Sequence, residues 1–318
     1  MSAKHYSVSK TFGIAAPENL CVTGYGERGP YVPHIDQHYV FRRDVLRDVI
    51  AWLEGGNGEG LYLTGPTGAG KSSILIQIAA RLNLPIQRAA GNSRLELADL
   101  IGQCQAVNGS TLFCPGPLTL AMKEGHLFLM DEIDLLDPGM ATGLNPIVEG
   151  APVLVPQTGE LIKPHPDFRF VATGNTTGLG DGTGLYQGTL RQNLAFLDRF
   201  WVVKVGYPEP AVEKQLLERE ASQLPVVERE RMIEVANEIR RLFMGESDAP
   251  SAIEVTMSTR ALVRRARLAV VFRGAPLSYS LDRALTFRAQ LETREAILQV
   301  VQRHFGDEAI EPFSRPSR

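Results

Sequence analysis

The residues Gly65-Pro66-Thr67-Gly68-Ala69-Gly70-Lys71-Ser72-Ser73 have the types and the spacing that phosphate binding needs. Glycines let a backbone fold closely round phosphate oxygens and direct its N–H groups at them, and a helix that begins there adds its positive dipole end. The pattern GxxxxGK[ST] predicts a phosphate-binding loop in which Lys71 reaches the β- and γ-phosphates and the Ser72 hydroxyl holds Mg²⁺. ATP and Mg²⁺ are the expected ligands.

Two carboxylates, Asp131 and Glu132, follow the apolar run 127–130 later in the chain. Beside a phosphate loop, this arrangement predicts that Asp131 holds Mg²⁺ through water and that Glu132 polarises the attacking water. Acidic residues at such a position can also cap a helix N-terminus, and capping alone would account for Asp134 and Asp137.

Asn175 ends the next apolar strand pattern, Phe168–Ala172. An Asn after a strand is usually a turn residue. In this order along the chain, however, its side chain is a candidate to donate a hydrogen bond to the γ-phosphate or to the attacking water.

These residues must be positioned by a sheet, and the patterns predict one. Strands alternate with helices at 41–53, 71–82, 116–124 and 139–148, so residues 41–207 are expected to form an α/β domain with a mainly parallel sheet between helices. From 208 to 318 the pattern is only helical, with helices expected at 209–220, 226–243, 258–273, 279–290 and 293–305. Residues 1–40 contain several Gly and Pro and are expected to form an irregular arm with room for a short strand.

Three further segments stand out between these elements. Turn signals at Asn108-Gly109 and Thr158-Gly159 predict two β-hairpins, within 102–116 and 152–163. Residues 176–192 are rich in Gly and are expected to be irregular, either mobile or ordered by a partner.

The composition is that of an ordinary soluble protein, with a formal net charge of -3 and 22% charged residues. No Lys/Arg run marks a nucleic-acid footprint, so binding of nucleic acid is disfavoured. Cys21, Cys104 and Cys114 are too few and too scattered for a metal knuckle or a disulfide framework. The N-terminal residues lack an apolar signal core, and no run of about 18 apolar residues could span a bilayer, so we expect a cytoplasmic protein with no membrane partner.

These motifs together resemble those of the AAA+ ATPases. GPTGAGKSS is similar to their Walker A motif, HLFLMDEID to Walker B and FVATGN to sensor 1. The two expected hairpins resemble the helix-2 insert and the pre-sensor-1 hairpin of the MoxR branch. Within that branch, VSKTFGI, YVPHIDQHYVFRRD, KPHPDFRFVATGNTTGLGDGTGLYQGT and LDRFWVV resemble the cobaltochelatase ATPase subunits, so the likeness covers roughly residues 7–207.

The resemblance implies roles for further residues. Arg199 matches the arginine finger that projects into the nucleotide of the neighbouring subunit, with Arg191 a weaker candidate. Arg260 matches sensor 2 in a helical lid, after Ser258 as a possible N-cap. Residues 39–41 would lie near the adenine, although a core role fits them equally. The family works as a homo-oligomeric ring, here expected to be a hexamer, which remodels a protein client with a von Willebrand A domain partner.

Other functions stay open at this point. One is the ATPase subunit of a cobalt or magnesium chelatase, although DLLDPGMATGLNPIVEG lacks residues typical of the cobaltochelatase subunits. The six His have no ligand spacing, so the chain itself is expected not to bind cobalt or a porphyrinoid. Another is a nucleic-acid-stimulated motor, which the charge disfavours. A purely structural nucleotide binder is disfavoured because Glu132, Asn175 and Arg199 are all present.

Overall fold

The computed structural model describes residues 2–107, 109–181, 186–245 and 253–306. The chain divides into two compact units, the first built mainly from residues up to Gly206 and the second mainly from Tyr207 onward. The two units are described separately below.

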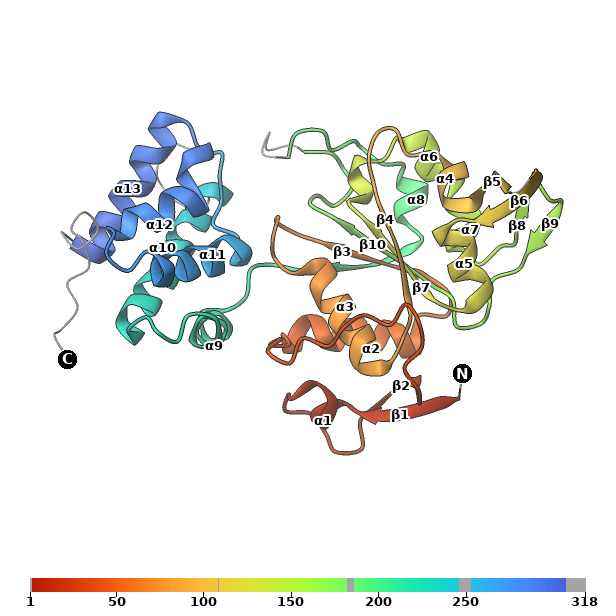
Figure 1. Ribbon diagram of the computed structural model, residues 1–318, viewed down its shortest axis with the longest axis horizontal. Helices are drawn as coiled ribbons and strands as arrows, with labels where there is room; N and C mark the ends of the chain where they lie inside the picture. The colour runs from red at the N-terminus through yellow and green to blue at the C-terminus, as the bar shows by residue number, and fades with distance from the viewer. Residues whose placement is uncertain (1, 108, 182–185, 246–252, 307–318) are drawn as a thin grey trace. The chain divides into compact units, whose positions relative to one another are not determined.

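A five-stranded parallel sheet organises the first unit (Figure 1). Its strands, in spatial order, are β11 (Phe200–Lys204), β3 (Gly60–Thr64), β10 (Arg169–Gly174), β7 (Leu127–Asp131) and β4 (Ile86–Ala90). The strand that precedes the phosphate loop therefore lies between the last two strands of the unit. The predicted α/β fold with a parallel sheet is confirmed, and β7 and β10 begin and end within two residues of the apolar runs 127–130 and 168–172.

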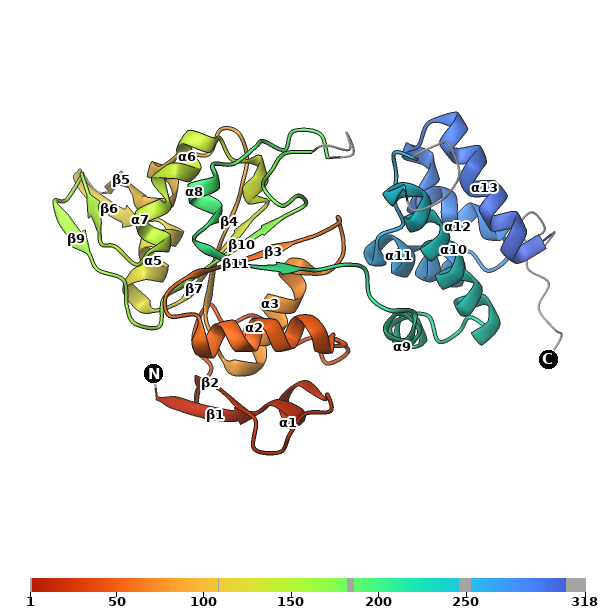
Figure 2. The ribbon, with the colours of Figure 1, turned by 180° about the vertical axis from the view of Figure 1, so that it is seen from behind.

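Both faces of the sheet are covered by helices, which is why its strands read as nearly continuous apolar runs. On one face, the side chains of Tyr62, Phe128, Phe170 and Phe200 form one core with the helices that follow β6. Helices α2 (Arg43–Gly55) and α3 (Lys71–Leu82) lie together on the other side (Figure 2). The remaining helices of this unit are α4 (Leu97–Ile101), α5 (Pro117–Glu124), α6 (Pro138–Gly143), α7 (Asn145–Val148) and α8 (Leu194–Leu197).

The helix predicted over 139–148 is in fact two short helices, α6 and α7. Pro146 lies in the first turn of α7 and has no N–H to donate. Proline is therefore tolerated at the start of α7, but it would interrupt a helix that continued from α6. Asp137 caps α6 as predicted, because its Oδ1 accepts from the N–H groups of Gly139 and Met140.

The N-terminal segment is more regular than the sequence predicts. Residues 1–40, expected to be irregular, contain β1 (Ala3–Ser7), α1 (Val8–Phe12) and β2 (Cys21–Tyr25), with β1 and β2 paired antiparallel. Gly24, one of the glycines on which the prediction of an irregular arm rests, lies within β2. A Cβ at this position would be 2.3 Å from the carbonyl oxygen of Leu82. Here glycine permits a close backbone approach and does not break the strand.

The two predicted hairpins are present. The first pairs β5 (Gly102–Val107) with β6 (Ser110–Pro115), and the second pairs β8 (Val153–Val155) with β9 (Glu160–Ile162). Of the first turn, Asn108 lies outside the described residues, and Gly109 has φ 81°. Of the Gly-rich segment 176–192, residues 182–185 lie outside the described part, and Leu179 forms an isolated bridge with Arg191.

The second unit is helical, as predicted. Its elements are α9 (Pro210–Glu220), α10 (Val226–Met244), α11 (Thr259–Val271), α12 (Leu277–Ala284), the 3₁₀ turn η2 (Thr286–Arg288) and α13 (Leu291–Phe305). The helix predicted over 279–290 begins earlier, after Pro276 as N-cap, and ends at Ala284. A buried ion pair joins α9 to α10, since Arg240 Nη2 and Nη1 donate to the two carboxylate oxygens of Glu213 at 2.7 and 2.9 Å.

Among the described helices, none combines the length and the apolar character needed to cross a lipid bilayer.

Candidate nucleotide-binding site

The phosphate loop joins β3 to α3 at the carboxyl end of the sheet. Gly65 has φ 151°, and a Cβ there would lie 2.0 Å from the carbonyl oxygen of Val205, so only glycine fits. Gly70 has φ 92° and precedes the first turn of α3, a helix of 12 residues. The first N–H groups of α3 have no partner within the helix, so they and the helix dipole favour an anion at this point.

Lys71 is brought together with Asn175, as the sequence predicts for two groups that contact the same phosphate. Lys71 is only 9% exposed, and its Nζ donates to the carbonyl oxygens of Gly65 at 2.7 Å and Pro66 at 3.0 Å. It also donates to Asn175 Oδ1 at 3.0 Å. The amide NH₂ of Asn175 makes no hydrogen bond to the described residues and can donate to a phosphate or to water.

Asp131 lies directly beside the loop. Ser72 Oγ donates to Asp131 Oδ1 at 2.5 Å, and Thr173 Oγ1 donates to the same oxygen at 3.1 Å. A hydroxyl and a carboxylate that converge in this way are the hard oxygen donors that Mg²⁺ takes alongside water and phosphate oxygens. The residues therefore fit the predicted cation, with Ser72 and Asp131 as the groups that would hold it.

Arg88 is a site residue that the motif analysis missed. From β4, its Nη2 forms an ion pair with Asp131 Oδ2 at 2.6 Å. The only signal in the sequence is a charged residue within the otherwise mostly apolar strand 86–90. Because Arg88 neutralises the carboxylate from the side opposite Ser72, it fixes the orientation of the Asp131 side chain.

Glu132 has a strained backbone. Its φ and ψ are 55° and 46°, in the left-handed region that residues other than glycine rarely adopt. The N–H group of Glu132 donates to Thr173 Oγ1 at 3.2 Å. Strain of this kind concentrates at functional sites. The Glu132 side chain is exposed at the carboxyl end of the sheet and makes no hydrogen bond to another described residue.

Asp134 is not the helix cap that the sequence allows. It is fully buried, and its Oδ2 accepts from Asn175 N–H at 2.8 Å, Thr176 N–H at 2.9 Å and Thr176 Oγ1 at 3.1 Å. Tyr62 supports the same loop, since its hydroxyl donates to the carbonyl oxygen of Thr176 at 2.6 Å. Burial, followed by the nearby Asp134 charge, raises the pKa of Tyr62 well above its usual value, so its hydroxyl stays a donor.

Arg199 lies at the other end of the sheet. It immediately precedes β11, whose residues Phe200 to Lys204 run parallel to Gly60 to Thr64 of β3. The phosphate loop follows β3, so a strand of five residues, about 16 Å, separates Arg199 from it. One side chain cannot span that distance. Arg199 is a surface residue with its side chain 25% exposed.

The remaining predicted residues are placed as follows. Arg260 is exposed in the first turn of α11, where Ser258 Oγ caps the helix as predicted by accepting from Ala261 N–H at 3.1 Å. Ser73 is exposed in the first turn of α3. Phe41 is buried, and its ring packs edge-on against Phe12 with the centroids 5.0 Å apart. This contact gives Phe41 a packing role.

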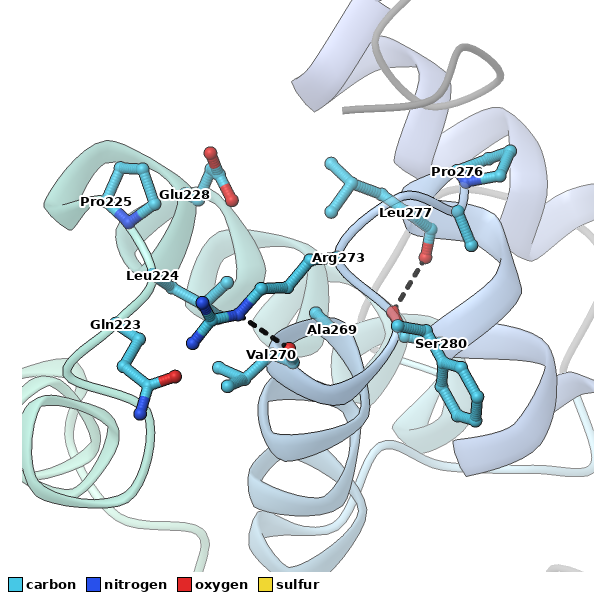
Figure 3. Close-up of a pocket in the computed structure, with 12 residues that line it drawn as sticks. Gln223, Leu224, Pro225, Glu228, Ala269, Val270, Arg273, Pro276, Leu277 and Ser280 are labelled. Carbon is cyan, nitrogen blue, oxygen red and sulfur yellow. Dashed lines mark hydrogen bonds between the residues drawn. The ribbon is translucent and has the colours of Figure 1, made fainter. Parts of the chain in front are cut away.

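A small cavity in the second unit is not a nucleotide site (Figure 3). It has a volume of about 40 Å³, which is room for one or two waters. Two of its polar groups are engaged within the unit: Arg273 Nε donates to the carbonyl oxygen of Val270 at 3.0 Å, and Ser280 Oγ donates to that of Leu277 at 2.9 Å. The candidate site is thus the carboxyl end of the sheet.

The fold and this site define a class of protein. A parallel sheet carries a glycine loop with a buried Lys after one strand, an acidic pair after a second and an Asn after a third, all at one end. That is the arrangement of a P-loop nucleotide-binding domain of the AAA type.

Comparison with known proteins narrows this class. The AAA domain (dynein-related subfamily) matches residues 60–200, and the CbbQ/NirQ/NorQ C-terminal domain matches residues 213–304. The chain is 36% identical over 203 residues to the aerobic cobaltochelatase subunit CobS of Sinorhizobium sp, a match that covers 62% of this chain and 60% of that protein. It is 30% identical over 260 residues to the protein NorQ of Paracoccus denitrificans, covering 80% and 85% of the two chains.

A third relative is the denitrification regulatory protein NirQ of Stutzerimonas stutzeri, 30% identical over 255 residues that cover 79% of this chain and 86% of that protein. The chain belongs to the MoxR family of AAA+ ATPases, with an AAA domain followed by a CbbQ/NirQ/NorQ C-terminal domain. The resemblance drawn from the sequence motifs is confirmed.

Proposed function

We propose that this protein is a Mg²⁺-dependent ATPase that works as a hexameric ring and remodels a protein client together with a von Willebrand A domain partner. Membership of the MoxR family supports the ATPase chemistry. The observation that carries the proposal for the site is the convergence of Lys71 on Asn175 and of Ser72 on Asp131 at one end of the sheet.

Each site residue of this chain has its own role in the proposed ATP hydrolysis. The loop amides of Gly65–Ser73 and the Lys71 ammonium hold the β- and γ-phosphates. Ser72 and Asp131 would hold Mg²⁺, which would offset the negative charge of the phosphates. Glu132 takes a proton from the attacking water, and Asn175 orients that water or the γ-phosphate. Asp134 and Tyr62 position Asn175 through the backbone of the loop after β10.

Arg199 completes the site of the adjacent subunit in this proposal. Its place at the amino end of β11, away from its own phosphate loop, supports action in trans. Its positive charge then offsets charge that develops on the transferred phosphoryl group. Arg260, as sensor 2, would report the γ-phosphate to the helical unit. Hydrolysis therefore depends on assembly.

The two hairpins are the proposed contact with the client. Leu112 of β6, Leu154 of β8 and Leu161 of β9 are more than half exposed. Both hairpins lie at the same end of the first unit in the two views (Figures 1 and 2). Exposed apolar side chains on projecting hairpins suit transient contact with a partly unfolded or detachable segment of another protein.

A chelatase role is the second candidate, because the relative at 36% identity is a cobaltochelatase subunit. Two observations favour the first candidate. The match to CobS covers 60% of that protein, whereas the matches to NorQ and NirQ cover 85% and 86% of theirs. The C-terminal domain also belongs to the CbbQ/NirQ/NorQ type.

One experiment tests the proposal. Glu132→Gln is expected to bind ATP and form a stable ring, because the isosteric amide keeps the contacts but cannot accept the proton. Affinity capture of this variant with ATP and Mg²⁺ should retain a von Willebrand A domain protein, and omission of Mg²⁺ should release it. Normal turnover by Glu132→Gln contradicts the assigned site, and co-purification of chelatase subunits supports the second candidate.

A further inference from the structure

Arg199 is held against its own protomer by Glu149. Arg199 Nη2 lies 2.8 Å from Glu149 Oε1, and Nη1 donates to the carbonyl oxygen of Ala195 in α8. A guanidinium binds phosphate through a pair of parallel N–H groups. In this conformation both terminal nitrogens are already engaged within the subunit.

The third nitrogen of the Arg199 guanidinium, Nε, has no acceptor in this conformation among the residues that the structure describes. The Nε atom is also buried. A buried donor without an acceptor costs free energy, so a different set of acceptors can displace this one.

The surroundings leave room for the change. Arg199 and Glu149 line a cavity of about 380 Å³ at the amino end of the sheet. Two other carboxylates line it, Glu59 and Asp198. Glu59 Oε2 instead accepts from Trp201 Nε1 at 2.6 Å, and Asp198 makes no ion pair with Arg199. Glu149 is therefore the carboxylate that restrains the guanidinium.

We propose that Glu149 is a latch that holds Arg199 away from the subunit interface until the triphosphate of an adjacent subunit replaces it. The inference rests on the proposed action of Arg199 in trans. A triphosphate carries more negative charge than one carboxylate and offers oxygens in pairs, so the exchange is favourable once subunits meet. Before they meet, the latch lowers the fraction of subunits whose arginine is ready.

The size of the effect follows from exposure. The Glu149 side chain is 55% exposed, and an ion pair at such a position is weak. The latch therefore shifts the equilibrium by about two- to fivefold and does not block the enzyme. It sets the subunit concentration at which the ring becomes active.

The test compares ATP turnover per subunit over a range of protein concentrations. Glu149→Gln is expected to turn over about two- to fivefold faster than wild type at concentrations below half-maximal activity and to converge with it at high concentration. Asp198→Asn, which removes a carboxylate from the same cavity, is the matched control and is expected to follow the wild-type curve. Binding of a fluorescent ATP analogue to the dilute subunit should be unchanged in Glu149→Gln, because the latch lies at the opposite end of the sheet from the loop.

Two results separate the latch from the function on which it rests. Loss of turnover in Arg199→Ala, with Glu149→Gln as slow as wild type or slower at every concentration, overturns the latch and leaves the trans arginine in place. Wild-type turnover by Arg199→Ala contradicts the trans arginine itself. In the Arg199→Ala background Glu149→Gln is expected to have no effect, and any acceleration there would show that Glu149 acts through another group.

Discussion

The two ends of the parallel sheet differ in how many hydrogen bonds hold their charged side chains and in how deeply these side chains are buried. At the carboxyl end, Lys71 makes three hydrogen bonds. The fully buried Asp134 accepts three through Oδ2, while its Oδ1 has no partner among the described residues. At the amino end, Arg199 is partly exposed, is paired with an exposed Glu149 and keeps a buried N–H without an acceptor.

This difference agrees with the role proposed for each end of the sheet. The carboxyl end is preorganised by one chain, since its groups fix one another before any ligand arrives. The amino end is only loosely fixed, which suits a group that must leave its own subunit. Four changes test the comparison.

The largest effect is expected from Lys71→Ala. Without the ammonium, the β- and γ-phosphates lose their only buried cation from this loop, and binding of a fluorescent ATP analogue should fall below detection. Lys123→Ala is the control, because Lys123 forms only a surface ion pair with Glu160. Binding close to that of wild type would mean that the nucleotide does not occupy the carboxyl end.

Arg199→Ala should separate binding from turnover. ATP binding by the subunit is expected to stay intact, while turnover falls by roughly 10³-fold or more, the usual contribution of an arginine finger. Single-turnover kinetics on saturated protein measures this loss directly. Arg191→Ala, which alters the other exposed arginine considered for this role, should have little effect; the reverse outcome would move the finger to Arg191.

Asp134→Ala tests the buried network at the carboxyl end. Three donors lose their acceptor, so we expect the free energy of unfolding of the first unit to fall by about 3 kcal/mol. Both tryptophans, Trp52 and Trp201, belong to this unit, so their fluorescence in a urea titration follows it alone. Asp137→Ala removes an exposed helix cap and should cost about 1 kcal/mol. Equal losses for the two variants would contradict the preorganised network.

The smallest difference is expected between single hydrogen bonds at the two ends. Tyr62→Phe removes a buried bond to the Thr176 carbonyl and should lower the free energy of unfolding by about 1 kcal/mol. Glu59→Gln weakens an exposed bond to Trp201 and should change it by less than about 0.5 kcal/mol. The same urea titration measures both, and a larger loss for Glu59→Gln would reverse the comparison.

Much of the carboxyl end could be predicted from the sequence because its chemistry is local. The loop around Lys71 is a contiguous motif, and Asp131 directly follows a buried strand, so strand periodicity and neighbouring residues suffice. The parallel sheet and its strand limits follow from the same alternation of apolar strands and helices.

The rest depends on contacts that sequence spacing does not encode. Asp134 could be read as a cap because nothing in its neighbours indicates that Asn175 and Thr176 would each bring an N–H group to it. Arg88 reaches Asp131 only because β4 lies next to β7 in the sheet. Glu149 follows α7 and Arg199 follows α8, and only the folded chain brings the two side chains together. Gly24 misled for a similar reason, since its role is set by Leu82.

Strand β11 has a mechanical consequence. It begins directly after Arg199, whose carbonyl oxygen accepts from Gly60 N–H at 3.0 Å, and just beyond its other end Val205 N–H donates to Thr64 at 2.7 Å, against Gly65 of the loop. Five extended residues in a sheet resist stretching and bending. In the proposed ring, where Arg199 acts on the adjacent subunit, β11 would connect the ATP molecules of two different sites. A displacement at one end of β11 would then be transmitted to its other end without any rearrangement of the core.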